Sequence, residues 1–188
     1  MTDLTTNLNY LQPTSYKLVI DRDNYPNLEY FAQTVTHPGM ILNPSEVPFR
    51  KIAGVPIVGG TLTFNELSCN IILDEDMTGY NEMYSWIRRV VDNVPVKAIN
   101  RTSTQAPTYS DITLSILSSH NNQTKQVRYF ECCPVALGDI NFESTATGTE
   151  FITFNVSFRF TYFDILNKNA TTGAFADSDS FNVAGSVG

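Results

Sequence analysis

Alternating apolar and polar residues near the start of the chain predict two short strands. Residues 15–21 place Tyr16, Leu18 and Ile20 on one side, which is the period of a half-buried strand. Residues 30–36 resume the pattern after a polar break at 23–27 that contains a proline. Two such runs around a break are typical of a β-hairpin, and we predict one here.

Residues 37–60 form a long arm that combines four prolines with many bulky apolar side chains. Proline lacks a backbone donor and breaks helices, so the arm is predicted to run extended or to turn. A loop that stays in water does not need so much apolar surface, so we expect the arm to be covered, either by the protein's own core or by a neighbouring copy. The residues proposed for this contact are Met40, Ile41, Leu42, Val47, Phe49, Ile52, Val55 and Ile57.

Residues 61–73 predict a further strand that leads into the one predicted helix. A shift of phase near residues 65–66 indicates a bulge or a fresh start in this strand. The helix is predicted over residues 79–94, begun by the acidic run at 74–76 and limited by Pro95. The apolar face that should pack on a sheet holds Met83, Trp86, Ile87 and Val90.

The second half of the chain predicts another hairpin and one long strand. Residues 111–117 and 125–132 alternate on either side of a polar turn, which indicates a hairpin. Residues 134–144 are predicted to cross over, with Gly138 at a bend. Residues 150–165 alternate most strongly, so this strand is expected to be central. Its apolar face carries Ile152, Phe154, Val156, Phe158, Phe160 and Tyr162.

Length and composition fit one mainly β domain followed by a tail. The chain has 188 residues, of which 42% are hydrophobic, and a domain of this size buries a full core. We assign residues 1–166 to the domain and residues 167–188 to a low-complexity extension that is expected to be disordered alone. We expect neither a signal peptide nor a membrane span.

The charge of the chain argues against tight binding to nucleic acid. The net charge is −7 and the pI is near 4.7, whereas a surface that grips phosphates needs clustered positive charge. An acidic surface is nevertheless compatible with nucleic acid that passes without sticking, because like charges repel.

Candidate chemistry is sparse, and we do not expect an enzyme. His37 lies within the arm and His120 in a hairpin turn, and neither is placed as a general base beside a nucleophile. The cysteines Cys69, Cys132 and Cys133 lie in predicted strands, where a small buried side chain is the simpler interpretation. We therefore predict no catalytic residue, no metal and no cofactor.

Several short patterns occur in a fixed order along residues 11–166. They are Phe31-x-Gln33-x-Val35-x-x-Pro38-Gly39, Val47-Pro48 with Arg50-Lys51-Ile52-Ala53-Gly54, Thr63-Phe64-x-x-Leu67 leading to Asp74, a short helix with Trp86, Cys133-Pro134-x-x-Leu137-Gly138-Asp139-Ile140, and Phe154-x-Val156-x-Phe158-x-Phe160-x-Tyr162. Each pattern is weak alone, and their order and spacing carry the signal. Together they resemble the tail tube proteins of contractile-tailed bacteriophages, the family that includes the T4 tube subunit.

The resemblance implies a β-sandwich whose copies join sheet edges into a hexameric ring with a continuous inner barrel. Rings would stack into a hollow tube inside a contractile sheath, with the arm in contact with the adjacent ring. The implied partners are the tail sheath, baseplate and tail terminator proteins, in a phage particle assembled in the host cytoplasm. DNA would pass through the bore without specific binding. The acidic residues proposed to face the bore, with ordinary solvated surface as the alternative, are Asp139, Glu143 and Glu150.

Three other functions stay open at the level of sequence. The chain could form a single initiator or terminator ring at the baseplate or tail end. It could be the tube subunit of a bacterial injection or secretion machine that carries no genome. It could also be an enzyme of unrecognised mechanism.

Overall fold

Two antiparallel sheets share one long strand and enclose the core together with one helix. The computed structural model describes residues 10–21, 24–28, 32–49, 53–57, 60–90, 108–144, 151–168 and 173–177. Its elements are β1 (Tyr16–Ile20), β2 (Ala32–Thr36), β3 (Met40–Leu42), β4 (Ser45–Phe49), β5 (Ala53–Ile57), β6 (Leu62–Phe64), β7 (Leu67–Ile72), α1 (Thr78–Val90), β8 (Ser110–Leu117), β9 (Gln123–Leu137), β10 (Thr153–Arg159), β11 (Tyr162–Lys168) and β12 (Phe175–Asp177).

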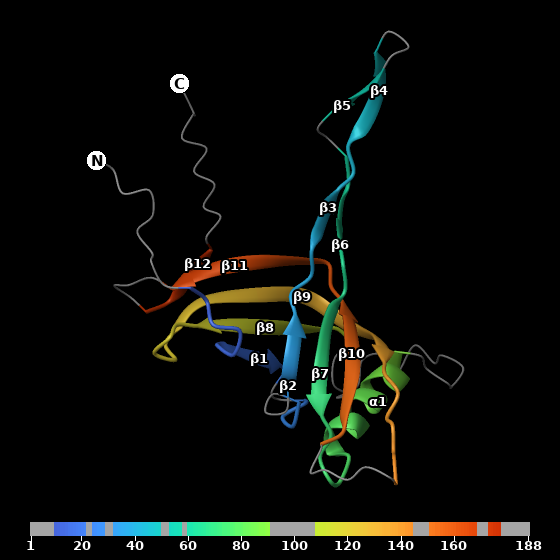
Figure 1. Cartoon of the computed structure of the whole chain (residues 1–188), viewed down its shortest axis with the longest axis vertical. Coiled ribbons are helices and arrows are strands. Elements are labelled where there is room, and N and C mark those ends of the chain that lie inside the picture. Colours follow the sequence, from blue (N-terminus) through green and yellow to red (C-terminus); the bar gives the residue numbers. More distant parts are fainter. Residues whose placement is uncertain are drawn as a thin grey trace, which may run out of the picture.

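Eight of the strands form two sheets that meet at β9, and the pairs β3–β6 and β4–β5 are separate two-stranded sheets. Sheet A has the order β1-β8-β9-β11-β12, and sheet B has the order β9-β10-β7-β2, with antiparallel neighbours throughout. The strands of sheet A lie across those of sheet B, and α1 lies beside sheet B (Figure 1). The described part of the chain is therefore mainly β, with a sandwich-like body and one helix, as predicted.

Strand β9 passes from sheet A to sheet B at Glu131. The φ angle of Glu131 is 53°, and its carboxylate accepts a 2.7 Å hydrogen bond from the hydroxyl of Thr161. Thr161 lies between β10 and β11, and its amide donates to the carbonyl of Phe130. The chain therefore passes between the two sheets at Glu131 and again at Thr161, and these two crossing points are in contact. Bulges and bends allow such a change of sheet.

This exchange corrects two predictions about the second half of the chain. The strand expected over residues 150–165 is two strands, β10 in the interior of sheet B and β11 in the interior of sheet A. Since β11 belongs to sheet A, Tyr162 leaves the apolar row of β10 and is 45% exposed. The crossover expected from Pro134 begins later, because β9 continues to Leu137.

The core lies between the two sheets and the helix. Trp86 stacks on Tyr25 with ring centroids 4.5 Å apart and lies 5.9 Å from the ring of Phe158. The indole nitrogen of Trp86 donates to the carbonyl of Thr108 at 2.8 Å, so its polar atom is satisfied inside the core. The fully buried side chains also include Leu18, Ile20, Leu67, Ile71, Met83, Ile112, Tyr129, Phe154 and Val156.

The predicted hairpin of residues 15–21 and 30–36 is wrong, although both strands exist. Strand β1 pairs with β8 and strand β2 pairs with β7, so the two strands lie in different sheets. The segment between them contributes Tyr25 and Leu28 to the core instead of forming a tight turn. The predicted hairpin of β8 and β9 is confirmed, as is the fresh start between β6 and β7.

Helix α1 begins where the acidic run predicts. The Asp74 carboxylate accepts hydrogen bonds from the amides of Thr78 and Gly79 at 2.9 and 3.2 Å, which satisfies donors that a helix start leaves free. Of the predicted packing residues, Met83 and Trp86 are buried and Ile87 is half-buried. The prediction is wrong for Val90, which lies in the last helical turn and is 43% exposed. Residues 91–94 lie outside the described part.

Part of the predicted C-terminal tail joins sheet A. Strand β12 pairs with β11, with Leu166 opposite Asp177 and Lys168 opposite Phe175. The low-complexity composition gave no sign of this strand. The rest of the extension beyond residue 177 lies outside the described residues.

Candidate assembly surfaces

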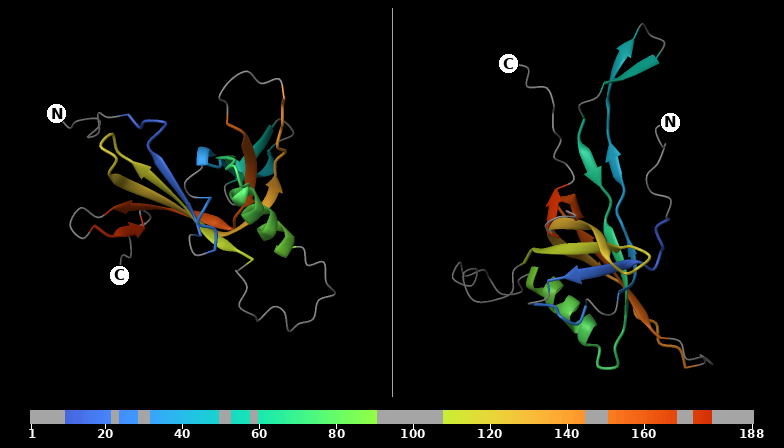
Figure 2. Two further views of the ribbon diagram at one scale, coloured as in Figure 1. Left: turned by 90° about the horizontal axis from the view of Figure 1, so that it is seen from below. Right: turned by 90° about the vertical axis from the view of Figure 1, so that its left-hand side faces the viewer.

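The arm is a hairpin that projects from sheet B and does not fold back on the body. It continues β2 and β7 through the pair β3–β6 and ends in the pair β4–β5 (Figure 1). The right panel of Figure 2 shows it extending well beyond both sheets. Its two strands pair with each other, so its side chains and the outward backbone groups of its edges are left without cover.

Seven apolar side chains of the arm are between 46% and 58% exposed in the isolated chain. These are Met40, Ile41, Leu42, Val47, Val55, Ile57 and Leu62. The sequence analysis named all of these except Leu62. The backbone of Phe49 lies in β4, but its side chain and the whole of Ile52 fall outside the described part.

The outer half of the arm has one face that carries valine and isoleucine side chains and an opposite face made of prolines, a glycine and Glu46. In the β4–β5 register, Val47 is opposite Val55 and Ser45 is opposite Ile57. The alternating positions put Glu46, Pro48 and Pro56 on the other face. Both prolines are tolerated because a two-stranded ribbon has only edge strands. A partner would therefore meet one defined side of this ribbon.

Gly60 lies at the joint between the two halves of the arm. A Cβ atom added there would lie 1.4 Å from the carbonyl oxygen of Asn43, and the amide of Asn43 bonds to the Thr61 carbonyl at 3.2 Å. Only glycine allows this approach of the two backbones.

We expect Gly60→Ala to redirect the arm while the body keeps its stability. The free energy of unfolding of the subunit should change by less than about 0.5 kcal/mol, whereas amide protection along β3 and β6 should fall in hydrogen exchange. Gly39→Ala is the matched control, because its added Cβ would meet only the side-chain amide nitrogen of Asn65, at 3.4 Å. Equal protection in both variants would contradict this role of Gly60.

An aromatic cluster anchors the root of the arm to the body. Phe64, at the end of β6, lies 5.5 Å from the rings of both Phe160 and Phe163. His37, on the other side of the hairpin, packs edge-on against Phe163 at 5.0 Å, and its Nδ1 is 2.6 Å from the hydroxyl of Tyr129. This anchor was not predictable from the sequence, because its residues come from four separate segments. In the sequence, the only feature that these residues share is an aromatic side chain.

Contact with Phe163 and Tyr129 partly desolvates His37 and lowers its pKa although the residue remains exposed, which gives the root a weak dependence on pH. Below about pH 6.5 the imidazole of His37 is protonated more in the unfolded state than in the folded state. The free energy of unfolding therefore decreases as the pH falls from about 6.5 through the lowered pKa of His37. We expect the melting temperature of the wild type to fall more steeply than that of His37→Gln between neutral pH and pH about 5. Equal slopes in thermal melts would contradict the prediction.

Sheet B ends in two strands that have a partner on one side only among the described residues. Strand β2 pairs only with β7, and residues 133–137 of β9 pair only with β10. The hydroxyl of Tyr16 donates to the carbonyls of Ala32 and Gln33, which occupies the start of the β2 edge. These edges were not predictable from the sequence, because alternation does not indicate which distant strands pair.

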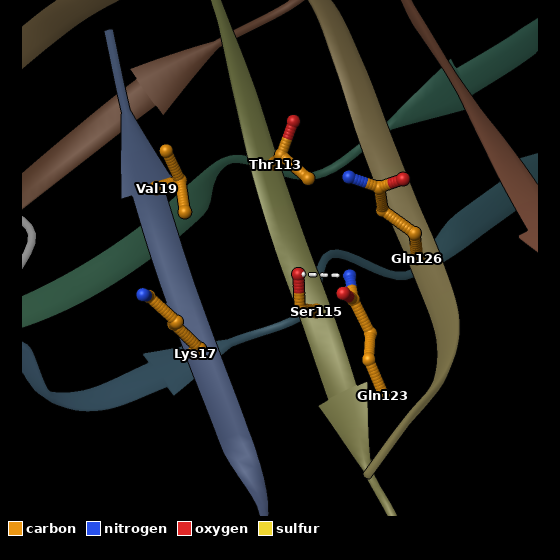
Figure 3. A pocket seen from close by; sticks show the side chains of 6 residues that line it. All are labelled: Lys17, Val19, Thr113, Ser115, Gln123 and Gln126. Atoms are coloured by element: carbon orange, nitrogen blue, oxygen red, sulfur yellow. Dashed lines mark hydrogen bonds between the residues drawn. The ribbon is translucent and has the colours of Figure 1, made fainter. Parts of the chain in front are cut away.

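The outer face of sheet A holds a polar hollow of about 330 Å³ lined by residues of three strands. Figure 3 shows side chains from β1, β8 and β9 around it, with the amide of Gln123 donating to the hydroxyl of Ser115 at 2.7 Å. The lining residues are Lys17, Val19, Thr113, Ser115, Gln123 and Gln126. Nearby, Arg128 forms an exposed 2.8 Å ion pair with Asp111 and lies over the ring of Phe130. Nothing in this arrangement resembles a catalytic set.

The residues considered for chemistry or for the bore are dispersed. Cys69 and Cys132 are buried without a disulfide, and burial raises the pKa of each to about 12. Asp139 and Glu143 lie on the exposed segment that follows β9, and Glu150 is outside the described residues. In the described ranges, no group of three or more His, Cys, Asp or Glu residues is arranged to hold a metal. No described helix is long and apolar enough to cross a membrane.

No protein-family model and no curated protein matches the sequence. Solved structures do match the fold. The tube-terminating cap of the anti-feeding prophage has a TM-score of 0.60 at 13% identity, over 89% of this chain and 99% of that one. A chain of the sheath–tube complex of the extracellular contractile injection system PVC has a TM-score of 0.59 at 11% identity, over 85% and 94% of the two chains. A chain of the anti-feeding prophage baseplate has a TM-score of 0.52 at 12% identity, over 81% and 91%.

Proposed function

We propose that this chain, which has the tail tube fold found in contractile injection systems, is a structural subunit that polymerises as stacked rings into the inner tube of a contractile phage tail. The resemblance of its sequence patterns to phage tube proteins supports the phage setting. The fold is shared with cap, baseplate and sheath–tube assemblies, which supports a place in such a tube.

The projecting arm is the single observation that carries the proposal. Full burial of a Val, Leu, Ile or Met side chain contributes about 1.5–3 kcal/mol. Covering the exposed half of the seven apolar side chains would therefore contribute about 5–10 kcal/mol per arm. The hairpin is already paired before contact, so little backbone entropy is lost on docking. A second copy in the adjacent ring is the proposed cover.

The open edges of sheet B support ring closure by the same copies. Along β9-β10-β7-β2 each strand reverses direction, so β2 and β9 run in opposite directions. If the copies of a ring are related by rotation about an axis that runs along these strands, each strand points the same way in every copy. The β2 edge of one copy can then pair antiparallel with the β9 edge of the next. This contact is heterologous, and it closes into a ring, for which we propose six copies.

In the assembled tail, the sheath would surround the tube, and the baseplate and terminator proteins would bound its ends. The genome would pass through the bore without specific binding, and the particle would assemble in the host cytoplasm. We propose a purely structural role without catalysis. The hydroxyl of Ser119 lies 3.3 Å from Nδ1 of His120, but these are neighbouring residues in an exposed turn and not a site in a pocket.

Negative-stain electron microscopy of the purified protein tests the proposal. Stacked rings should form hollow tubes of variable length as protein concentration rises. A protein that stays monomeric at every concentration would overturn the proposal. Retention of DNA in tails assembled with the sheath would separate a phage tube from an injection-system tube that carries no genome.

A terminator or initiator ring is the second candidate function. It is favoured by the likeness to the tube-terminating cap, which covers 99% of the cap chain. The same micrographs distinguish the two, because a cap protein should form single rings that never stack on themselves. The copy number in an intact particle would decide between many rings and one.

A further inference from the structure

The outer face of sheet B carries mostly uncharged side chains, small polar ones in its middle rows together with Ile72 opposite Thr153 and the exposed Val135 at the β9 edge. Burial alternates along β7 and β10, so the residues between the core positions point away from the core. Two rows cross the sheet in the strand register, Thr34–Asn70–Asn155 and Thr36–Ser68–Ser157–Ala136. Within this face, the Ser68 hydroxyl donates to the side-chain oxygen of Asn155 at 2.9 Å.

Charge is confined to one end of this face among the described residues. Glu66 and Arg159 lie there, 3.7 Å apart and both exposed, near the root of the arm. The outer face of sheet A differs, because the rows of β8, β9 and β11 include Asp111, Arg128 and Asp164. The two outer faces of the sandwich therefore have different chemistry.

Strand directions decide which of these faces can line a bore. The arm continues β2 and β7 away from the body (Figure 1), so if it reaches the next ring, the strands of sheet B run along the tube. The strands of sheet A then lie across the tube. Among the described residues, sheet B has an open edge on each side, which a continuous wall requires, whereas sheet A ends in β1 and the three-residue strand β12.

We propose that the outer face of sheet B is the wall of the bore and that hydroxyl and amide groups make this wall electrically neutral. This inference rests on the proposed function. A neutral wall does not bind DNA through counterion release, and it does not repel the DNA phosphates. The passage of DNA through the bore should therefore depend little on salt concentration. It differs from the acid-lined wall that Asp139, Glu143 and Glu150 would provide.

Site-specific labelling tests the position of the wall. In a Cys133→Ser background, Asn155→Cys reports on sheet B and Thr113→Cys is the matched reporter on the outer face of sheet A. Tubes are treated after assembly with a small maleimide carrying a heavy-atom cluster and imaged by cryo-electron microscopy. We expect added density inside the bore for residue 155 and away from the bore for residue 113.

Two outcomes of this labelling would overturn the assignment. Density from residue 155 on the outside of the tube would place another face in the bore. Failure of residue 155 to react in intact tubes, while it reacts in dissociated subunits, would mean that copies bury this face. Both outcomes leave the tube itself intact, whereas an unlabelled wild type that forms no tube contradicts the proposed function.

A charge variant tests the neutrality of the wall. Tubes of Asn155→Lys should retain short DNA in a nuclease-protected, salt-sensitive form, at about tenfold or more above wild-type tubes. Wild-type tubes should retain no more than background at any salt concentration. Salt-sensitive, protected DNA in wild-type tubes would show a positive wall, and a wild-type level of retention in the lysine variant would show that residue 155 does not face the bore. Either result would overturn the proposal.

Discussion

Removing the arm should leave a folded subunit that no longer stacks. Ile41 and Thr63 are opposite each other in the β3–β6 pair, two positions from each of the hydrogen-bonded pairs at 39/65 and 43/61, and are therefore a hydrogen-bonded pair themselves. Residues 42–62 can accordingly be replaced by an Asn-Gly turn that closes the remaining hairpin. The aromatic anchor of Phe64 is kept. Since the core does not include the excised residues, the melting temperature should stay close to that of the wild type, while tubes disappear in electron micrographs.

A matched pair of point variants refines this prediction. Val47→Asp places a carboxylate on the apolar face of the β4–β5 ribbon, and Pro48→Asp places the same charge on the opposite face. Burying an unpaired carboxylate against a partner is costly, so only Val47→Asp should block stacking. Normal tubes from the excision variant, or equal loss of tubes in both point variants, would contradict the role given to the arm.

Phe158→Asp should unfold the isolated subunit. Phe158 is fully buried and lies against Trp86 in the centre of sheet B. The substitution combines the loss of a large side chain, which costs about 3–5 kcal/mol, with a buried charge that has no partner. Domains of this kind have about 5–15 kcal/mol of stability, so circular dichroism should show little or no folded protein in water.

The control for this variant adds the same group on the opposite face of the same strand. Asn155→Asp keeps the side-chain volume, and Asn155 is exposed, so urea denaturation should give a midpoint close to that of the wild type. A folded Phe158→Asp protein with an unchanged midpoint would mean that the two faces of β10 are wrongly assigned.

Local signals in the sequence predicted most of the elements but not how distant strands pair. The β8–β9 hairpin was predictable because its turn lies between the paired strands. Strand β1 showed clear alternation, yet its partner β8 lies about ninety residues away, and alternation carries no information about distant partners. The break near Thr161 was missed because apolar alternation continues through it while the chain changes sheets.

The candidate surfaces were predictable to a similar degree. Prolines and bulky apolar residues identified the arm, because no compact element explains such a composition. Its anchor of His37, Phe64 and Phe163 was not predictable, since those residues meet only in the folded chain. The uncharged face of sheet B became visible only when the register aligned its rows.

A cryo-electron microscopy reconstruction of the assembled protein tests the central claim most directly, because it locates the arm in the particle. The account predicts a hollow tube in which Met40, Leu42, Val47 and Val55 are buried against a copy in the next ring. An assembled particle in which these side chains stay in solvent, or lie against their own subunit, would contradict it.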